Sequence, residues 1–191
     1  MNACGKYSLY AFAFLSSIAA FGDNEVFDGQ ELYNQNFSYQ SFVNSSWVGA
    51  DANHSSFFSS NLWGASFASA TLTNTDFTNA IISYADFSNA TSKGFTKEQL
   101  YSTKSYKDKD LYDVNLGGND LSGWDFKEQN LGSASFYSAT LTNTDFSKAD
   151  LTSAHFESST LADTKFTNAN LGSARFDSAT LTNAKFTNAN L

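Results

Sequence analysis

The sequence contains no proline and one cysteine, Cys4, so it can form neither an internal disulfide nor a cysteine-based zinc site. Charged residues are scarce, at 16% of 191 residues against the usual quarter or so. The formal net charge is −8, which argues against a generic nucleic-acid binder, since such proteins carry a basic patch. Aromatic residues make up another 16%, including 19 Phe, which makes the chain too apolar to be simply disordered. The length fits one domain.

The N-terminal segment, residues 1–22, differs from the rest of the chain. Lys6 precedes an apolar run over 7–21, and a polar stretch begins at Asp23. This pattern is typical of a secretory signal peptide, with Ala20 and Gly22 suited to a cleavage before Asp23. The run of about 15 residues is shorter than the roughly 20 that span a bilayer, so no transmembrane span is predicted. We expect a secreted, periplasmic or cell-envelope protein. The alternative is that 1–22 form an N-terminal cap of a cytoplasmic protein.

A repeat with a period of five residues covers most of the remaining chain. Large apolar residues, here called centres, recur at every fifth position, and Ala52 is the one weak centre in the first run. The first run comprises Phe27, Leu32, Phe37, Phe42, Trp47, Ala52, Phe57, Leu62, Phe67, Leu72, Phe77, Ile82 and Phe87. The second run extends in the same step from Leu111 to Leu191. Two positions before most centres there is a small residue, such as Ala134, Ala139 or Thr144.

The period of five fits neither a helix nor a flat strand. It fits a chain that turns one corner per pentad, so that four corners close a coil of about 20 residues, with coils about 4.8 Å apart. Each face of a coil then directs one large and one small residue inward, which fills the interior to native density. Leu and Phe alternate from Leu121 to Leu191, which predicts stacks of Phe rings 20 residues apart, as for Phe126, Phe146, Phe166 and Phe186.

The pentads resemble those of the pentapeptide-repeat family. They read ATLTN, TDFSK, ADLTS and AHFES over 139–158, and the resemblance covers roughly 25–90 and 110–191. It implies an all-β fold, a right-handed quadrilateral parallel β-helix, of roughly seven coils. We predict a first stack over 23–90 and a second over 111–191. A phase-shifting insertion, 91–110, separates them.

The insertion breaks the five-residue phase and carries five lysines: Lys93, Lys97, Lys104, Lys107 and Lys109. Thr96 followed by Gln99 is typical of a capping box at the start of a short helix. The insertion therefore serves either as a structural joint between the stacks or as a protruding loop that contacts a partner.

No group of residues points to catalysis, a cofactor or a metal. His54 and His155 lie in different stacks without neighbours that suggest a metal site or a triad, and His155 precedes a centre and should point outward. The spacings of calcium-binding loops are absent. We therefore predict no catalytic, cofactor-binding or metal-binding residues, and no enzyme.

Residues 20 apart on the outside should form columns along the stack. One such column reads Asp125, Asp145, Lys165 and Lys185, in which an Asp should pair with a Lys, although an exposed pair contributes little.

The sequence favours a non-enzymatic structural or binding solenoid whose flat polar faces contact an unidentified protein or surface polymer. The alternative, drawn from the resemblance, is a cytoplasmic DNA mimic that binds a type II topoisomerase such as DNA gyrase. Nine acidic and five basic residues leave 111–191 with a net charge of −4. DNA of the same length would carry about −11, at one charge per about 1.7 Å. The protein itself should not bind nucleic acid directly. A homodimer through the C-terminal coil is a further expectation, because an open coil end is an exposed sheet edge.

Overall fold

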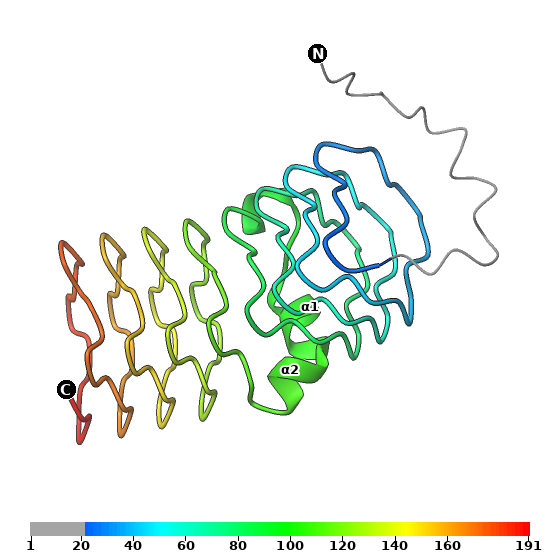
Figure 1. Cartoon of the computed structure of the whole chain (residues 1–191). Helices are drawn as coiled ribbons and strands as arrows, with labels where there is room; N and C mark the ends of the chain where they lie inside the picture. The colour runs from blue at the N-terminus through cyan, green and yellow to red at the C-terminus, as the bar shows by residue number, and fades with distance from the viewer. Residues whose placement is uncertain (1–21) are drawn as a thin grey trace, which may run out of the picture.

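The computed structural model describes residues 22–191, so the prediction for residues 1–22 lies, apart from Gly22, outside the described part of the chain. The described residues wind into coils stacked along an axis (Figure 1). Parallel bridges join residues 20 apart within each stack, from Val26–Ser46 in the first to Asn170–Asn190 in the second. Each pentad contributes one bridge residue, which confirms the 20-residue coil.

A tight turn follows each centre and produces the corner. The backbone N–H three residues after the centre donates to the carbonyl of the centre, as from Ala70 to Phe67 at 3.0 Å. The residue two after the centre has a positive φ, for example 56° at Asn74. Asn tolerates this left-handed conformation better than most residues, which explains why Asn, Ser and Gly dominate this position.

Phe rings fill the middle of each stack. The ring of Phe146 stacks on Phe126 at 5.2 Å and on Phe166 at 5.4 Å, with interplanar angles of 8° and 4°. It also meets Phe136 and Phe156 edge-on, at 5.2 and 5.7 Å. The predicted stacking is therefore confirmed, and Phe columns from opposite faces interlock at the axis. Each such pair contributes about 0.5–1.5 kcal/mol beyond burial.

The small residue of each coil packs against the coil before it. Ala134 and Ala139 are buried there. Where Thr replaces Ala, the hydroxyl reaches a carbonyl of the preceding coil: Thr144 Oγ1 donates to Leu121 at 2.9 Å. A buried hydroxyl is thus satisfied without disturbing the packing.

The first coil differs at these positions. In place of small residues it holds side chains that are exposed or half-buried: Glu25, Gln30, Gln35 and Gln40. The positions two before each centre are therefore polar in this coil, whereas they are small in coils that pack against a preceding coil.

Three short helices form the insertion (Figure 1): η2 (Thr91–Lys93), α1 (Lys97–Ser102) and α2 (Lys104–Lys107). The predicted capping box is confirmed: Thr96 Oγ1 accepts from Gln99 N at 3.3 Å and Gln99 Oε1 accepts from Thr96 N at 2.8 Å. No helix within residues 22–191 has the length and apolar character needed to cross a membrane.

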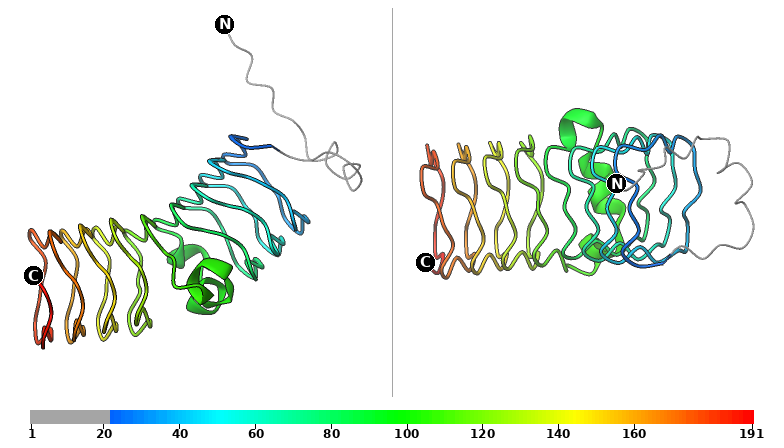
Figure 2. Two further views of the ribbon diagram at one scale, coloured as in Figure 1. Left: turned by 60° about the horizontal axis from the view of Figure 1, so that its bottom comes forward. Right: turned by 45° about the horizontal axis from the view of Figure 1, so that its top comes forward.

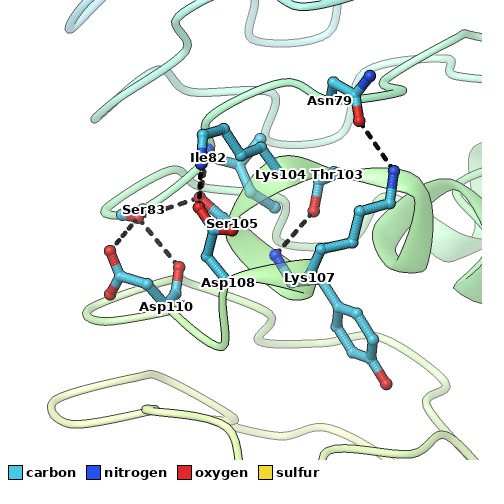
Figure 3. A network of polar contacts seen from close by, with 10 residues as sticks. Asn79, Ile82, Ser83, Thr103, Lys104, Ser105, Lys107, Asp108 and Asp110 are labelled. Atoms are coloured by element: carbon cyan, nitrogen blue, oxygen red, sulfur yellow. Dashed lines mark hydrogen bonds and ion pairs between the residues drawn. The ribbon is translucent and has the colours of Figure 1, made fainter.

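The helices take the place of a regular coil on part of the first stack. Gln99 Nε2 donates to two backbone carbonyls of that stack, at 2.7 and 2.8 Å. Ser105 Oγ accepts from Ile82 N at 3.0 Å and lies 3.1 Å from Ser83 Oγ (Figure 3). Ser83 Oγ in turn lies 3.0 Å from both the carbonyl and a carboxylate oxygen of Asp110, so one network joins the first stack, the insertion and the second stack (Figure 3).

The solenoid bends at the insertion. Asp86 pairs directly with Asn115, 29 residues later instead of 20, so nine residues are added between them. The helices lie on the outer side of the bend (Figure 2). On the opposite side, no helix within the described residues separates the two stacks, and the face that contains the Asp86–Asn115 bridge therefore lies on the inner side of the bend. We call it the concave face, and its bridge residues are Ser66, Asp86, Asn115, Ser135, His155 and Arg175.

The coil that follows the insertion is packed differently. All four of its small positions hold larger side chains: Val114, Asn119, Trp124 and Gln129. Asn119 is buried and its Nδ2 donates to Phe87 O at 2.9 Å. The ring of Trp124 is 6.1 Å from that of Phe95 in the insertion. These larger side chains occupy the space between the insertion and the first coil of the second stack.

Candidate functional site

Most outward carboxylates and amides serve the turns. Asp76 Oδ1 accepts from Thr78 N at 2.9 Å and Asp145 Oδ1 accepts from Ser147 N at 3.0 Å. Asn170 makes the same contact with Gly172 N at 3.4 Å. The frequent Asp and Asn before each centre thus have a structural reason, because their side chains accept the N–H two residues later in the turn.

The predicted charged column is present. Its bridges align Asp125, Asp145, Lys165 and Lys185. Asp145 Oδ2 lies 3.6 Å from Lys165 Nζ and 3.4 Å from Lys127 Nζ. Burial raises the pKa of Asp145, but the hydrogen bonds from Ser147 and Lys127 outweigh this and leave the pKa below its ordinary value. Within the column only Asp145 and Lys165 form an Asp–Lys pair, and Lys127 beside the column contacts both Asp125 and Asp145.

His54 lies at a corner with a φ of 59°. Its Nε2 is 3.1 Å from Asn74 Nδ2, and its ring is 5.2 Å from the ring of Tyr33. Within residues 22–191, no group of three or more His, Cys, Asp or Glu is arranged to hold a metal ion.

His155 lies on the concave face in a small charged cluster. His155 Nδ1 and Arg175 Nε each lie 3.1 Å from the same oxygen, Oε1 of Glu157. The Glu157 side chain is 12% exposed, and burial raises its pKa. Its own backbone N–H and the contact with His155 outweigh burial and leave the pKa below its ordinary value. The His155 side chain is 41% exposed, so it points outward as predicted but is not fully solvated.

This cluster forms one end of a shallow cleft on the concave face. The cleft is polar apart from the Tyr137 ring, and Tyr137 is 56% exposed. Its walls consist of Asp113, Asn115, Ser133, Ser135, Tyr137, His155 and Glu157. Hydroxyl, amide, carboxylate and imidazole groups therefore converge beside one exposed aromatic ring.

A row of aromatic side chains leads to the cleft. We call Trp63, Tyr84 and Tyr112 the aromatic row. The ring of Tyr84 lies 4.5 Å from that of Trp63 and 5.3 Å from that of Tyr112. Trp63 is 38% exposed and Tyr84 is 40% exposed. Tyr112 Oη lies 3.4 Å from Ser133 Oγ in the cleft, so the row and the cleft are continuous across the junction of the stacks.

The five-residue period predicts neither the aromatic row nor the cleft. One signal was available. Tyr84 occupies a corner position that is usually Asn, Ser or Gly, and it has a φ of 65°. A bulky residue at positive φ is unusual and marks a position to inspect. The alignment of Tyr84 with Tyr112 depends on the register across the insertion, which the period could not provide.

The profile of the family described as Pentapeptide repeats matches eight copies, over residues 55–91 and, in overlapping segments, 110–191. The match covers more than half of the chain, and the chain belongs to the pentapeptide-repeat family. The solenoid is accordingly a right-handed β-helix. Proteins of this class are generally non-catalytic structural or binding proteins. No curated protein sequence matches the chain.

Several solved structures are similar to this chain. One is HetL, a pentapeptide repeat protein involved in heterocyst differentiation regulation in Nostoc, with 23% identity and a TM-score of 0.37 over 87% of this chain and 71% of that chain. Another is a pentapeptide repeat protein of the Arabidopsis thaliana thylakoid lumen, with 23% identity and a TM-score of 0.33 over 72% and 67%. A third is QnrB1, a plasmid-mediated fluoroquinolone resistance protein, with 16% identity and a TM-score of 0.37 over 83% and 88%.

Proposed function

We propose that the protein is an exported, non-enzymatic binding solenoid of roughly seven coils interrupted by the insertion. The observation that supports a binding role is the surface formed by the aromatic row and the cleft. The interior is accounted for by packing, and most outward Asp and Asn side chains serve turns. The exposed rings of Tyr84 and Tyr137 serve neither purpose, and exposed aromatic groups beside polar ones are suited to contact a partner.

Export is tested by measuring the N-terminal mass of the native protein after cell fractionation. A start near Asp23 outside the cytosol would support the proposal, because it is the cleavage expected for the signal-like segment 1–22. An intact Met1 in the cytosol would contradict export and would make the segment a cap.

Binding is tested by immobilising the protein and recovering native partners, either a protein or a surface polymer. A Tyr84→Asn variant is the matched control, because Asn suits the left-handed corner and keeps the turn. Recovery that is equal for both forms would contradict a role for this surface.

A second candidate is a cytoplasmic DNA mimic that binds a type II topoisomerase such as DNA gyrase. One observation favours it: residues 22–92 contain no Lys or Arg, so the first stack is uniformly acidic. In the second stack, basic residues such as Lys165 and Lys185 lie among the acidic residues and reduce the net negative charge. Addition of the purified protein to a gyrase supercoiling assay tests this candidate, and supercoiling that is unaffected eliminates it.

We also propose that two copies associate through the coil at 171–191. Apolar side chains are exposed there, with Leu181 at 39% and Leu191 at 80%, and the rings of Phe176 and Phe186 are only partly buried. Light scattering over a concentration series tests this, and a monomer at high concentration excludes it.

A further inference from the structure

We infer that the inner side of the bend binds a linear, neutral polysaccharide, which lies along the solenoid axis from the aromatic row to the cleft. This inference rests on the proposed binding function and names the chemical class of the partner.

The aromatic row provides the apolar part of such a site. A sugar ring has a face of C–H groups and an edge of hydroxyls, so it is suited to side chains with an apolar body and a polar tip, such as Tyr and Trp. Tyr84 has a φ of 65°, which is unfavourable for a bulky residue. An Asn would form the same turn with less strain. The turn therefore does not require the Tyr84 ring. What distinguishes Tyr84 from the other corner tyrosine, Tyr39, is that its ring lies between those of Trp63 and Tyr112, at 4.5 and 5.3 Å.

The bend places the row and the cleft on one continuous surface. On the concave face the stacks meet directly through Asp86 and Asn115, and Tyr112 Oη reaches Ser133 Oγ at 3.4 Å. Trp63, Tyr84 and Tyr112 come from successive coils, about 4.8 Å apart. A linear chain along the axis thus meets a new side chain on every coil.

The charges on this side favour a neutral polymer. Residues 22–92 contain no Lys or Arg. Next to the cleft, the Arg175 guanidinium contacts Glu157, as does the His155 imidazole. Nucleic acid or an acidic polysaccharide would therefore meet the acids of the first stack without available counter-charges, whereas a neutral polysaccharide needs none.

The cleft supplies hydrogen-bonding groups for sugar hydroxyls. Ser133 and Ser135 contribute hydroxyls, Asn115 an amide and His155 a half-exposed imidazole. The ring of Tyr137 is exposed beside them. Serine hydroxyls and the Asn amide can each donate to and accept from sugar hydroxyls.

The test is affinity electrophoresis of the full chain in native gels that contain hydroxyethyl cellulose, glucomannan or mixed-linkage β-glucan. Alginate serves as the acidic control. We expect at least one neutral polymer to retard the protein and alginate to have no effect. Retardation by alginate alone, or by no polymer, would overturn the inference.

Two variants locate the site. The double variant Trp63→Ala/Tyr84→Asn should weaken binding about tenfold or more, since each ring contact contributes about 0.5–1.5 kcal/mol. Tyr39→Asn is the matched control, because Tyr39 is also a corner tyrosine, with a φ of 63° and an exposed fraction of 73%, but lies on another corner. It should bind as the native protein does. If both variants bound the polymer equally more weakly than the native protein, the proposed location of the site would be wrong.

Thermal melting by circular dichroism shows whether each variant keeps its fold. If the surface captures a native protein instead, and Tyr84→Asn abolishes this capture while no neutral polysaccharide binds, the polysaccharide inference fails. The proposed binding function would then still hold. Failure of both experiments would remove the binding function as well.

Discussion

Trp124→Ala should strongly destabilise the protein, although it introduces the small residue that is typical of this position in the repeat. Trp124 is 6% exposed, and its ring lies 6.1 Å from Phe95, 6.4 Å from Tyr101 and 6.2 Å from Phe126. Truncation of a buried aromatic ring typically costs about 3–5 kcal/mol of unfolding free energy. At a denaturant dependence of about 2 kcal/mol/M, the urea midpoint should fall by roughly 2 M.

Thr144→Ala is the matched control, because Thr144 occupies the same column one coil later, in a regular coil. Its hydroxyl donates to Leu121 O at 2.9 Å. That carbonyl keeps a second donor, the backbone N–H of Trp124 at 3.0 Å. The control should therefore lose only about 1 kcal/mol.

Urea titration should be followed by far-ultraviolet circular dichroism, because the variant removes one of three Trp and changes the fluorescence directly. Coils of a solenoid contact only their neighbours, so a loosened joint should also separate the unfolding of the two stacks into two transitions. A midpoint shift no larger than that of Thr144→Ala would refute the argument that Trp124 fills space left by the insertion.

Three further predictions concern other parts of the fold. Phe146→Leu keeps the site apolar but loses four ring contacts of about 0.5–1.5 kcal/mol each, so thermal denaturation should show a loss of about 2–5 kcal/mol of unfolding free energy, the upper value being that of full truncation of a buried Phe; an unchanged melting temperature would contradict this. Asp145 has a folded pKa below its unfolded value, so its contribution is complete above about pH 4 and is lost as the pH falls through the folded pKa; Asp145→Asn should flatten the loss of melting temperature in acid. Burial raises the pKa of Tyr106, so stability should decline as the pH rises above about 10, and Tyr106→Phe should weaken this decline in alkaline urea titrations.

The interior of each stack could be predicted because one physical requirement determines it. A coil of four corners leaves room for one large and one small residue per face, so the period alone identifies which residues meet. Phe146 therefore lies on Phe126 and Phe166, as the 20-residue spacing predicts. The capping box at Thr96 could also be predicted, because it depends only on residues three positions apart.

The outer surface could not be predicted, because it depends on register across the insertion. The sequence shows a break of 24 residues between the centres Phe87 and Leu111, whereas the bridges show that Asp86 pairs with Asn115. Only this pairing brings Tyr84 next to Tyr112 and extends the aromatic row to the cleft. The interior repeat carries no information about this alignment, since several loop lengths would keep both stacks intact.

The residues at the small positions reveal what lies before each coil. Where a regular coil precedes, as at Ala134, the position is small because the side chain packs against that coil. Where the insertion precedes, the position holds Trp124 or Asn119, which contact the helical segment or the last regular coil. In the first coil the position holds polar side chains such as Gln30. A residue other than Ala at these positions is therefore explained by the segment that packs against the coil, and it does not indicate a functional site. The aromatic row lies outside the core and is not explained by a neighbouring layer in this way, so it is where this protein's function should be sought.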